Sequence, residues 1–243
     1  MKANKFKMFY KLYEKEMREL KIEIWLTVLA IIGATILTYV GGADQRWTIL
    51  PLFLTAGLAA LLPVVTASKI FIKEFNHNTI YLMMSLPVGG GMILGSKLAA
   101  TVTQYLIGTI FFMISAAMLT LCLFPVEKDT LIKAMGSVPW GLFISIYFST
   151  VAFGIYLVVI TFFSQIISRL VTKFQNLVTV IALAGTLWLT FKLIDPLILE
   201  KDYYVGNMFM AADLFVYASL FFIGVAFVIG VVTVLIYNRR IEL

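Results

Sequence analysis

The chain has 243 residues, of which 61% are hydrophobic and only 13% are charged. Soluble domains carry about 25% charged residues, so this composition excludes an ordinary soluble domain and is typical of an integral membrane protein. The formal net charge is +6, but the basic residues are not interleaved with stacking aromatic residues as in a nucleic-acid groove. We therefore expect membrane lipid as a partner and no nucleic acid.

Residues 1–23 are predicted to form an amphipathic helix. Apolar residues recur there at spacings of three and four, which places them on one helical face: Phe6, Phe9, Tyr10, Tyr13, Met17 and Leu20. Such a helix can lie in the membrane interface with its lysines near lipid phosphates. Two interpretations stay open, a simple anchor or an elbow helix that also contacts a cytoplasmic partner. The segment is charged and the next apolar run can span, so we expect no cleavable signal peptide.

Six apolar runs are long enough to cross a membrane, since a spanning helix needs roughly 20 apolar residues. They lie at about 24–42, 48–68, 98–124, 140–163, 177–194 and 214–237. With the N-terminus inside, the predicted cytoplasmic segments hold 14 of the 19 lysines and arginines. This bias predicts a multi-pass protein of the cell membrane with both termini cytoplasmic. We expect one transmembrane domain over residues 1–243.

The stretch "SLPVGGGMILGSK" at 85–97 partly matches a phosphate-binding loop. Gly90 and Gly95 have the required separation, but Ser96 and Lys97 stand in reverse order. Leu98 occupies the place of the hydroxyl that binds magnesium. The chain therefore has no nucleotide-binding loop here, and its glycines at 89–91 are predicted to form a flexible turn before the third span.

A short helix is predicted just before this turn, in the long loop between spans 2 and 3. Asn78 can cap it at Thr79, and Pro87 ends it. Apolar side chains on such a helix at the membrane surface would be costly without a protein partner, and methionines suit an adaptable docking surface. The side chains concerned are Tyr81, Leu82 and Met84.

The pattern of Glu74, Asn78-Thr79, "LMMSLPV" and "ILGSK" resembles the first cytoplasmic loop of type-2 ABC export permeases. The resemblance covers the chain in architecture and this loop in motif. It implies an all-α integral membrane fold with six transmembrane helices, an N-terminal amphipathic elbow helix and a cytoplasmic coupling helix between spans 2 and 3. By this resemblance the coupling helix docks a separate cytoplasmic ABC ATPase through Glu74, Thr79, Ile80, Tyr81, Leu82, Met83, Met84, Ser85 and Leu86.

The same resemblance implies a second permease subunit, identical or related, and ATP and Mg on the ATPase, with no cofactor in this chain. Lys97 would mark the cytoplasmic end of the third span or reach lipid phosphates. In the second cytoplasmic loop, Arg169 and Lys173 are predicted on one helical face. Between Asp195 and Asp213 the resemblance implies short re-entrant helices.

A catalytic or metal site is not expected. The chain has one cysteine, Cys122, inside the third span, and one histidine, His77, which has no partner at ligand spacing. No ionisable group lies well inside a predicted span and no buried carboxylate is expected, which disfavours an ion-coupled transporter. The inner polar groups are hydroxyls and amides, which usually bond helix carbonyls or neighbouring helices: Gln104, Ser115, Ser145, Ser149, Thr161, Thr186 and Thr190.

The resemblance therefore implies the permease subunit of an ATP-driven exporter, with ATP hydrolysis on a separate chain. Apolar and hydroxyl side chains favour an amphipathic or hydrophobic cargo, such as a peptide, an antibiotic or a lipid-like compound. The alternative is a multi-span membrane protein outside the ABC class, either a secondary transporter or an immunity or sensor subunit that docks a partner.

Overall fold

The computed structural model describes residues 5–40, 45–76, 89–123, 140–171, 173–199 and 208–241. This part of the chain is helical: α1 (Lys5–Val40), α2 (Gln45–Asn76), α4 (Gly90–Leu123), α6 (Trp140–Arg169), α7 (Gln175–Leu199) and α8 (Met208–Ile241). Each of these 6 helices is long and apolar enough to cross a membrane. The prediction of a multi-pass, all-helical membrane protein with six spans is confirmed at this level.

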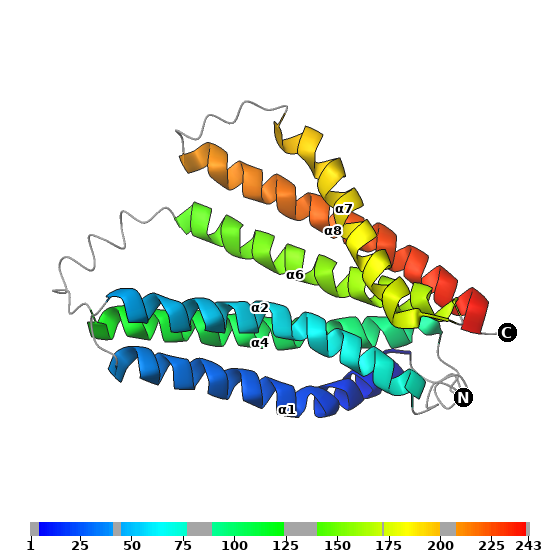
Figure 1. The fold of residues 1–243 in the computed structure, drawn as a ribbon, viewed down its shortest axis with the longest axis horizontal. Helices are drawn as coiled ribbons and strands as arrows, with labels where there is room; N and C mark the ends of the chain where they lie inside the picture. The colour runs from blue at the N-terminus through cyan, green and yellow to red at the C-terminus, as the bar shows by residue number, and fades with distance from the viewer. Residues whose placement is uncertain are drawn as a thin grey trace.

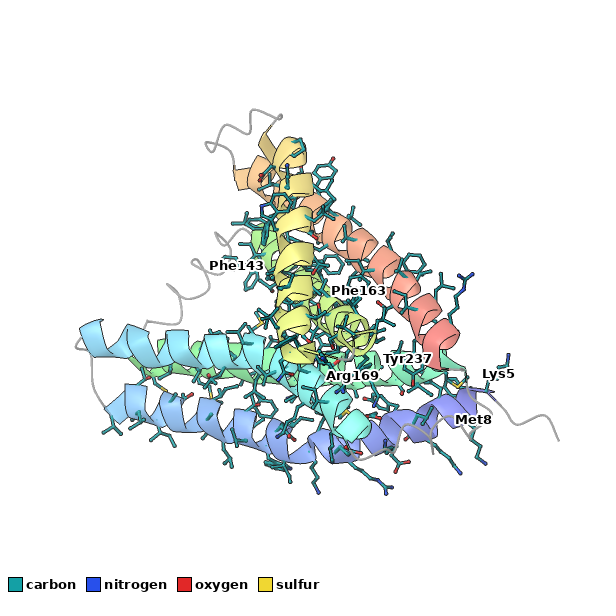
Figure 2. The ribbon with its side chains drawn as sticks, turned by 45° about the vertical axis from the view of Figure 1, so that its right-hand side comes forward. Lys5, Met8, Phe143, Phe163, Arg169 and Tyr237 are labelled. Atoms are coloured by element: carbon teal, nitrogen blue, oxygen red, sulfur yellow. The ribbon has the colours of Figure 1, made fainter. Side chains whose placement is uncertain are left out.

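The helices extend beyond the predicted spans. Helix α1 has 36 residues, about 54 Å at 1.5 Å per residue, whereas the hydrocarbon core is about 30 Å thick. It includes the predicted elbow segment and the first span without a break, and both views show it bending in its first half (Figures 1 and 2). The elbow segment and the first span are therefore parts of one helix.

The helices form two groups that lie close together at one end of the bundle and diverge toward the other (Figure 1). Helices α1, α2 and α4 lie side by side, and α6, α7 and α8 form the second group (Figure 2). The close end is the one at which α1 begins and α8 ends, and we call it the terminal end. Helices α2 and α4 also meet the predicted coupling loop there, since α2 ends at Asn76 and α4 begins at Gly90.

Two apolar clusters hold the bundle, and α6 contributes to both. The cluster between the two groups has a ring contact between Phe71 and Phe162, with centroids 5.8 Å apart. The second cluster joins α6, α7 and α8, where the rings of Tyr156 and Phe222 are 5.4 Å apart. The Tyr156 hydroxyl also donates to Thr190 Oγ1 at 2.8 Å. Helix α6 is thus the central element through which the groups are joined.

Inner hydroxyls mostly donate to backbone carbonyls one turn earlier in their own helix, as predicted. Thr161 donates to Leu157 O at 2.7 Å and Thr186 to Ala182 O at 2.9 Å. Ser115 and Ser145 make the same kind of bond. These hydroxyls are therefore satisfied within their own helices and leave few free polar atoms inside the bundle.

The link between α6 and α7 differs from its prediction. Arg169 is the last residue of α6, and its Nη1 donates to Gln175 Oε1 at 2.9 Å, at the start of α7. Lys173 lies in the link, next to Phe174 with a φ of 59°. The two basic residues are therefore not on one helical face, because a turn separates them.

The segment 195–213 also differs from the expected re-entrant helices. Helix α7 continues through Pro196 to Leu199, and α8 already begins at Met208. The described ends of this segment thus belong to the two long helices. Residues 200–207 lie outside the described residues.

Candidate functional site

The predicted docking residues stand between two helices that the structure does describe. Thr79, Ile80, Tyr81, Leu82, Met83, Met84, Ser85 and Leu86 lie outside the described residues. Glu74 is in the last turns of α2, but its side chain is also outside them. The candidate site is therefore built from the helices on either side of this segment, at the terminal end of the bundle.

A buried ion pair joins α1 to α4 at this end. Lys97 Nζ donates to Glu16 Oε1 at 2.9 Å, and each side chain is 1% exposed. Lys15 Nζ lies 3.5 Å from the same oxygen, whereas Glu16 Oε2 is buried without a hydrogen-bond partner among the described residues. Removing one partner of a buried pair typically costs about 3–5 kcal/mol, because the other charge stays buried and uncompensated.

This pair corrects two predictions. Lys97 lies in α4 with its side chain buried inside the protein, so it does not reach lipid phosphates. A buried carboxylate, Glu16, is present although none was expected. The buried face of the N-terminal segment is centred on Leu12, Glu16 and Leu20, whereas Phe6 and Tyr10 are exposed. Apolar periodicity alone does not identify this buried face, because a carboxylate stands at its centre.

Two further ion pairs, both exposed, join α1 to α2. Lys73 Nζ donates to Glu19 Oε2 at 3.0 Å, and Lys69 Nζ to Glu23 Oε1 at 3.1 Å. Glu16, Glu19 and Glu23 follow spacings of three and four, so they share one face of α1. We call the three pairs, Glu16–Lys97, Glu19–Lys73 and Glu23–Lys69, the ion-pair row. The outer pairs are each worth at most about 1 kcal/mol, but they fix the register of α1 against α2.

Apolar and polar contacts reinforce the row. Leu20 packs with Ile70 and Ala100, so that α1, α2 and α4 meet in one small cluster. Thr66 Oγ1 donates to Gln104 Oε1 at 2.8 Å and joins α2 to α4. Ion pairs, apolar packing and a hydrogen bond therefore hold α1, α2 and α4 together, so we expect these helices to move as one unit.

Glycines at the start of α4 allow close packing with helices on both sides. A Cβ at Gly90 would collide with Tyr237 and Asn238 of α8, and one at Gly91 would lie 3.5 Å from Val234. On the other side, a Cβ at Gly95 would lie 3.6 Å from the Phe9 ring of α1. Gly90 and Gly91 are helical, so the predicted flexible turn is wrong for them. Only Gly89 precedes the helix, where its carbonyl accepts from the Met92 amide at 2.9 Å.

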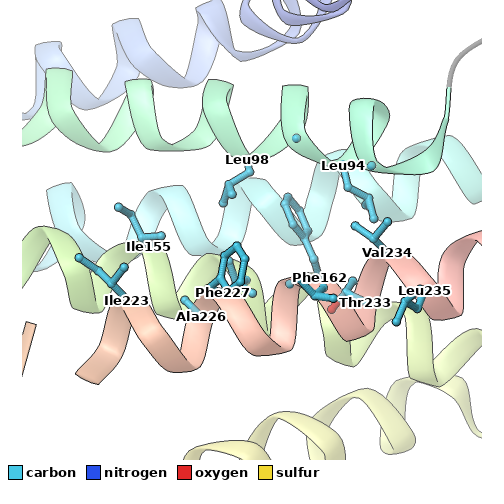
Figure 3. Close-up of a pocket in the computed structure, with 15 residues that line it drawn as sticks. Leu94, Leu98, Ile155, Phe162, Ile223, Ala226, Phe227, Thr233, Val234 and Leu235 are labelled. Carbon is cyan, nitrogen blue, oxygen red and sulfur yellow. The ribbon is translucent and has the colours of Figure 1, made fainter. Parts of the chain in front are cut away.

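An apolar groove of about 530 Å³ lies between α4, α6 and α8 beside these glycines (Figure 3). Its walls include Leu94 and Leu98 of α4, facing Phe227 and Val234 of α8. The one hydroxyl in the lining, on Thr233, already donates to the Ile229 carbonyl at 2.6 Å. The lining of the groove therefore has almost no free polar atoms, and such a surface suits a hydrophobic ligand.

The described residues contain no group of three or more side chains that could hold a metal ion. Cys122 is in the last turn of α4 and is exposed. Two features of the arrangement bear on function. One is the unit of α1, α2 and α4 beside the predicted docking segment, and the other is the apolar groove between α4, α6 and α8.

Comparison of the chain with protein-family models, with curated protein sequences and with solved structures finds no match.

Proposed function

We propose that this chain is the membrane-spanning permease subunit of an ATP-driven exporter of the type-2 ABC kind. Residues 79–86 would dock a separate cytoplasmic ATPase, with both chain termini on the same side. The observation that carries the proposal is the ion-pair row, because it joins each of the two helices that flank this segment to α1. A push on the segment then displaces α1, α2 and α4 together.

The second group of helices supplies the surface against which this unit moves. Helix α4 contacts α8 mainly through its first turns, at Gly90 and Gly91, and the groups diverge away from the terminal end. A rigid-body rotation about this contact would change the width of the apolar groove. Hinge motion of this kind is a common form of gating in proteins.

The partners follow from the same proposal. Two permease subunits, two copies of this chain or one copy with a relative, enclose the pathway, and each docks one ATPase. ATP and Mg²⁺ bind to the ATPase. The apolar groove supports an amphipathic or hydrophobic cargo, because a charged cargo would find no compensating polar group along its lining.

A second candidate is an ion-coupled secondary transporter, which the buried Glu16–Lys97 pair favours. Ionisable groups buried inside membrane proteins often take part in ion or proton movement. Glu16 Oε2, buried without a partner among the described residues, is the atom that would bind the proton or cation.

Vesicles containing the purified complex distinguish the two candidates. The exporter proposal predicts ATP-dependent movement of a lipid-like or peptide cargo, which ion gradients alone do not drive. Cargo movement driven by a proton or sodium gradient without ATP would favour the second candidate and contradict the first.

A paired set of variants tests the docking segment. Leu82→Asp with Met84→Asp should abolish ATP-dependent transport while the spans remain folded, because charges replace the apolar docking side chains. The matched control, Leu82→Ile with Met84→Leu, should retain transport. Full transport by the aspartate variant would contradict the docking assignment.

A further inference from the structure

On the first half of α1, three glutamates lie on the inner face, and the outer face carries mostly basic residues, with Glu14 paired to Arg18. Every glutamate of the helix is ion-paired: Glu16, Glu19 and Glu23 with lysines of α4 and α2, and Glu14 with Arg18 of its own helix. The exposed lysines Lys7, Lys11 and Lys21, by contrast, have no ion-pair partner within the described part of the chain. The outer face therefore carries net positive charge.

This basic face continues directly into the face of α1 that the membrane must cover. At 100° per residue, Lys7, Lys11 and Lys21 lie on the same side of the helix as Trp25 and Leu29. Trp25 is 59% exposed and Leu29 is 63% exposed. Tryptophan favours the boundary between hydrocarbon and water, so Trp25 marks the depth at which the outer face changes from apolar to basic.

Lys21 lies one turn before Trp25, about 6 Å along the axis, within reach of lipid headgroups. Along the helix axis, Lys11 lies about 15 Å and Lys7 about 21 Å farther from Trp25 than Lys21 does. Electrostatic attraction in physiological salt decays over about 8 Å. The three lysines should therefore contribute to lipid binding in decreasing order, from Lys21 to Lys11 to Lys7.

We propose that the outer face of α1 binds anionic phospholipid headgroups, held mainly by Lys21. Lys11 and Lys7 add a weaker, longer-range attraction. The inner glutamates make this possible, because the ion-pair row neutralises them and keeps them away from the headgroups. The inference depends on the membrane-spanning fold and does not depend on the proposed ATPase.

Trp25 supplies the reporter. The full chain, with Trp47, Trp140 and Trp188 replaced by phenylalanine, is placed in vesicles of phosphatidylcholine that contain a fixed fraction of brominated phosphatidylglycerol or of brominated phosphatidylcholine. The extent to which each brominated lipid quenches Trp25 fluorescence then gives the relative affinity of the protein surface around Trp25 for the two lipids. One lysine near an anionic surface contributes about a factor of five, so we expect about a fivefold preference for phosphatidylglycerol at low salt. At 1 M salt, where attraction decays over about 3 Å, the preference should vanish.

Single variants test the order. Lys21→Gln should reduce the preference most and Lys7→Gln least, whereas Lys21→Arg should preserve it. Lys192→Gln, in α7 near the opposite end of the bundle, is the matched control and should change nothing. Native mass spectrometry of the chain with all its tryptophans, counting retained phosphatidylglycerol, gives the same comparison without the tryptophan replacements.

Equal quenching by the two lipids in the unmodified lysine background would overturn the proposal. So would a larger effect of Lys7→Gln than of Lys21→Gln, because the lysine farthest from the membrane would then matter most. That order would point instead to a soluble acidic protein on this face.

Discussion

Replacing Lys97 by methionine should destabilise the protein strongly. The change keeps the length of the side chain but leaves the Glu16 carboxylate buried, with one oxygen already lacking a partner. The nearest remaining cation is Lys15, 3.5 Å from Glu16 Oε1 and 44% exposed. Breaking a buried pair costs about 3–5 kcal/mol. Since Lys15 compensates part of the charge, we expect the lower end of that range, about 3 kcal/mol.

The double variant Glu16→Leu with Lys97→Met provides the matched control. It removes both charges and fills the site with apolar side chains of similar size, a change that is often neutral or stabilising. We expect its free energy of unfolding to lie within about 1 kcal/mol of that of the native chain, and so about 2 kcal/mol above that of Lys97→Met. The measurement is reversible unfolding in mixed micelles, followed by tryptophan fluorescence.

Two results would refute this reasoning. If the single and double variants lose equal stability, the loss comes from packing and not from an unpaired carboxylate. If Lys97→Met unfolds like the native chain, the two side chains do not form a buried pair.

Three further predictions concern packing, surface charge and the groove. Gly90→Ala should cost about 1–3 kcal/mol by forcing α4 away from α8, whereas Gly89→Ala, with nothing within 4 Å of its added Cβ, should be silent in the same unfolding assay. Lys73→Gln should change stability by at most about 1 kcal/mol, and less at high salt. Gly230→Leu should fill the groove and reduce ATP-dependent cargo movement in vesicles. Gly224→Leu, on the same helix with open space around it, should retain transport, and equal loss in both would argue against cargo in the groove.

The spans could be predicted because each depends on a local property. A run of apolar residues long enough to cross hydrocarbon identifies a helix without any knowledge of its neighbours. The helix ends could not be predicted in this way, since α1 and α4 continue into polar sequence. Contacts between helices cover these extensions, since Leu12 of α1 packs with Met92 and Ile93 of α4.

The candidate site depends on contacts that are distant in sequence. Glu16 and Lys97 are 81 residues apart, so neither their pairing nor their burial follows from local pattern. One signal was present, since Leu12, Glu16 and Leu20 recur every four residues and place a carboxylate between two leucines. The turn predicted at Gly90 was wrong for a related reason. Glycine suits both a turn and a close contact between helices, and only the position of α8 decides between the two.

Co-purification tests directly whether a separate ATPase drives this chain. The tagged chain is isolated from native membranes in mild detergent, and accompanying proteins are identified and quantified by mass spectrometry. We expect a soluble ATPase to co-purify in about the same amount as the native chain. It should be absent from preparations of the Leu82→Asp, Met84→Asp variant and present in those of the conservative control, Leu82→Ile with Met84→Leu. Absence of any ATPase from the native chain, with all three preparations alike, would contradict this expectation.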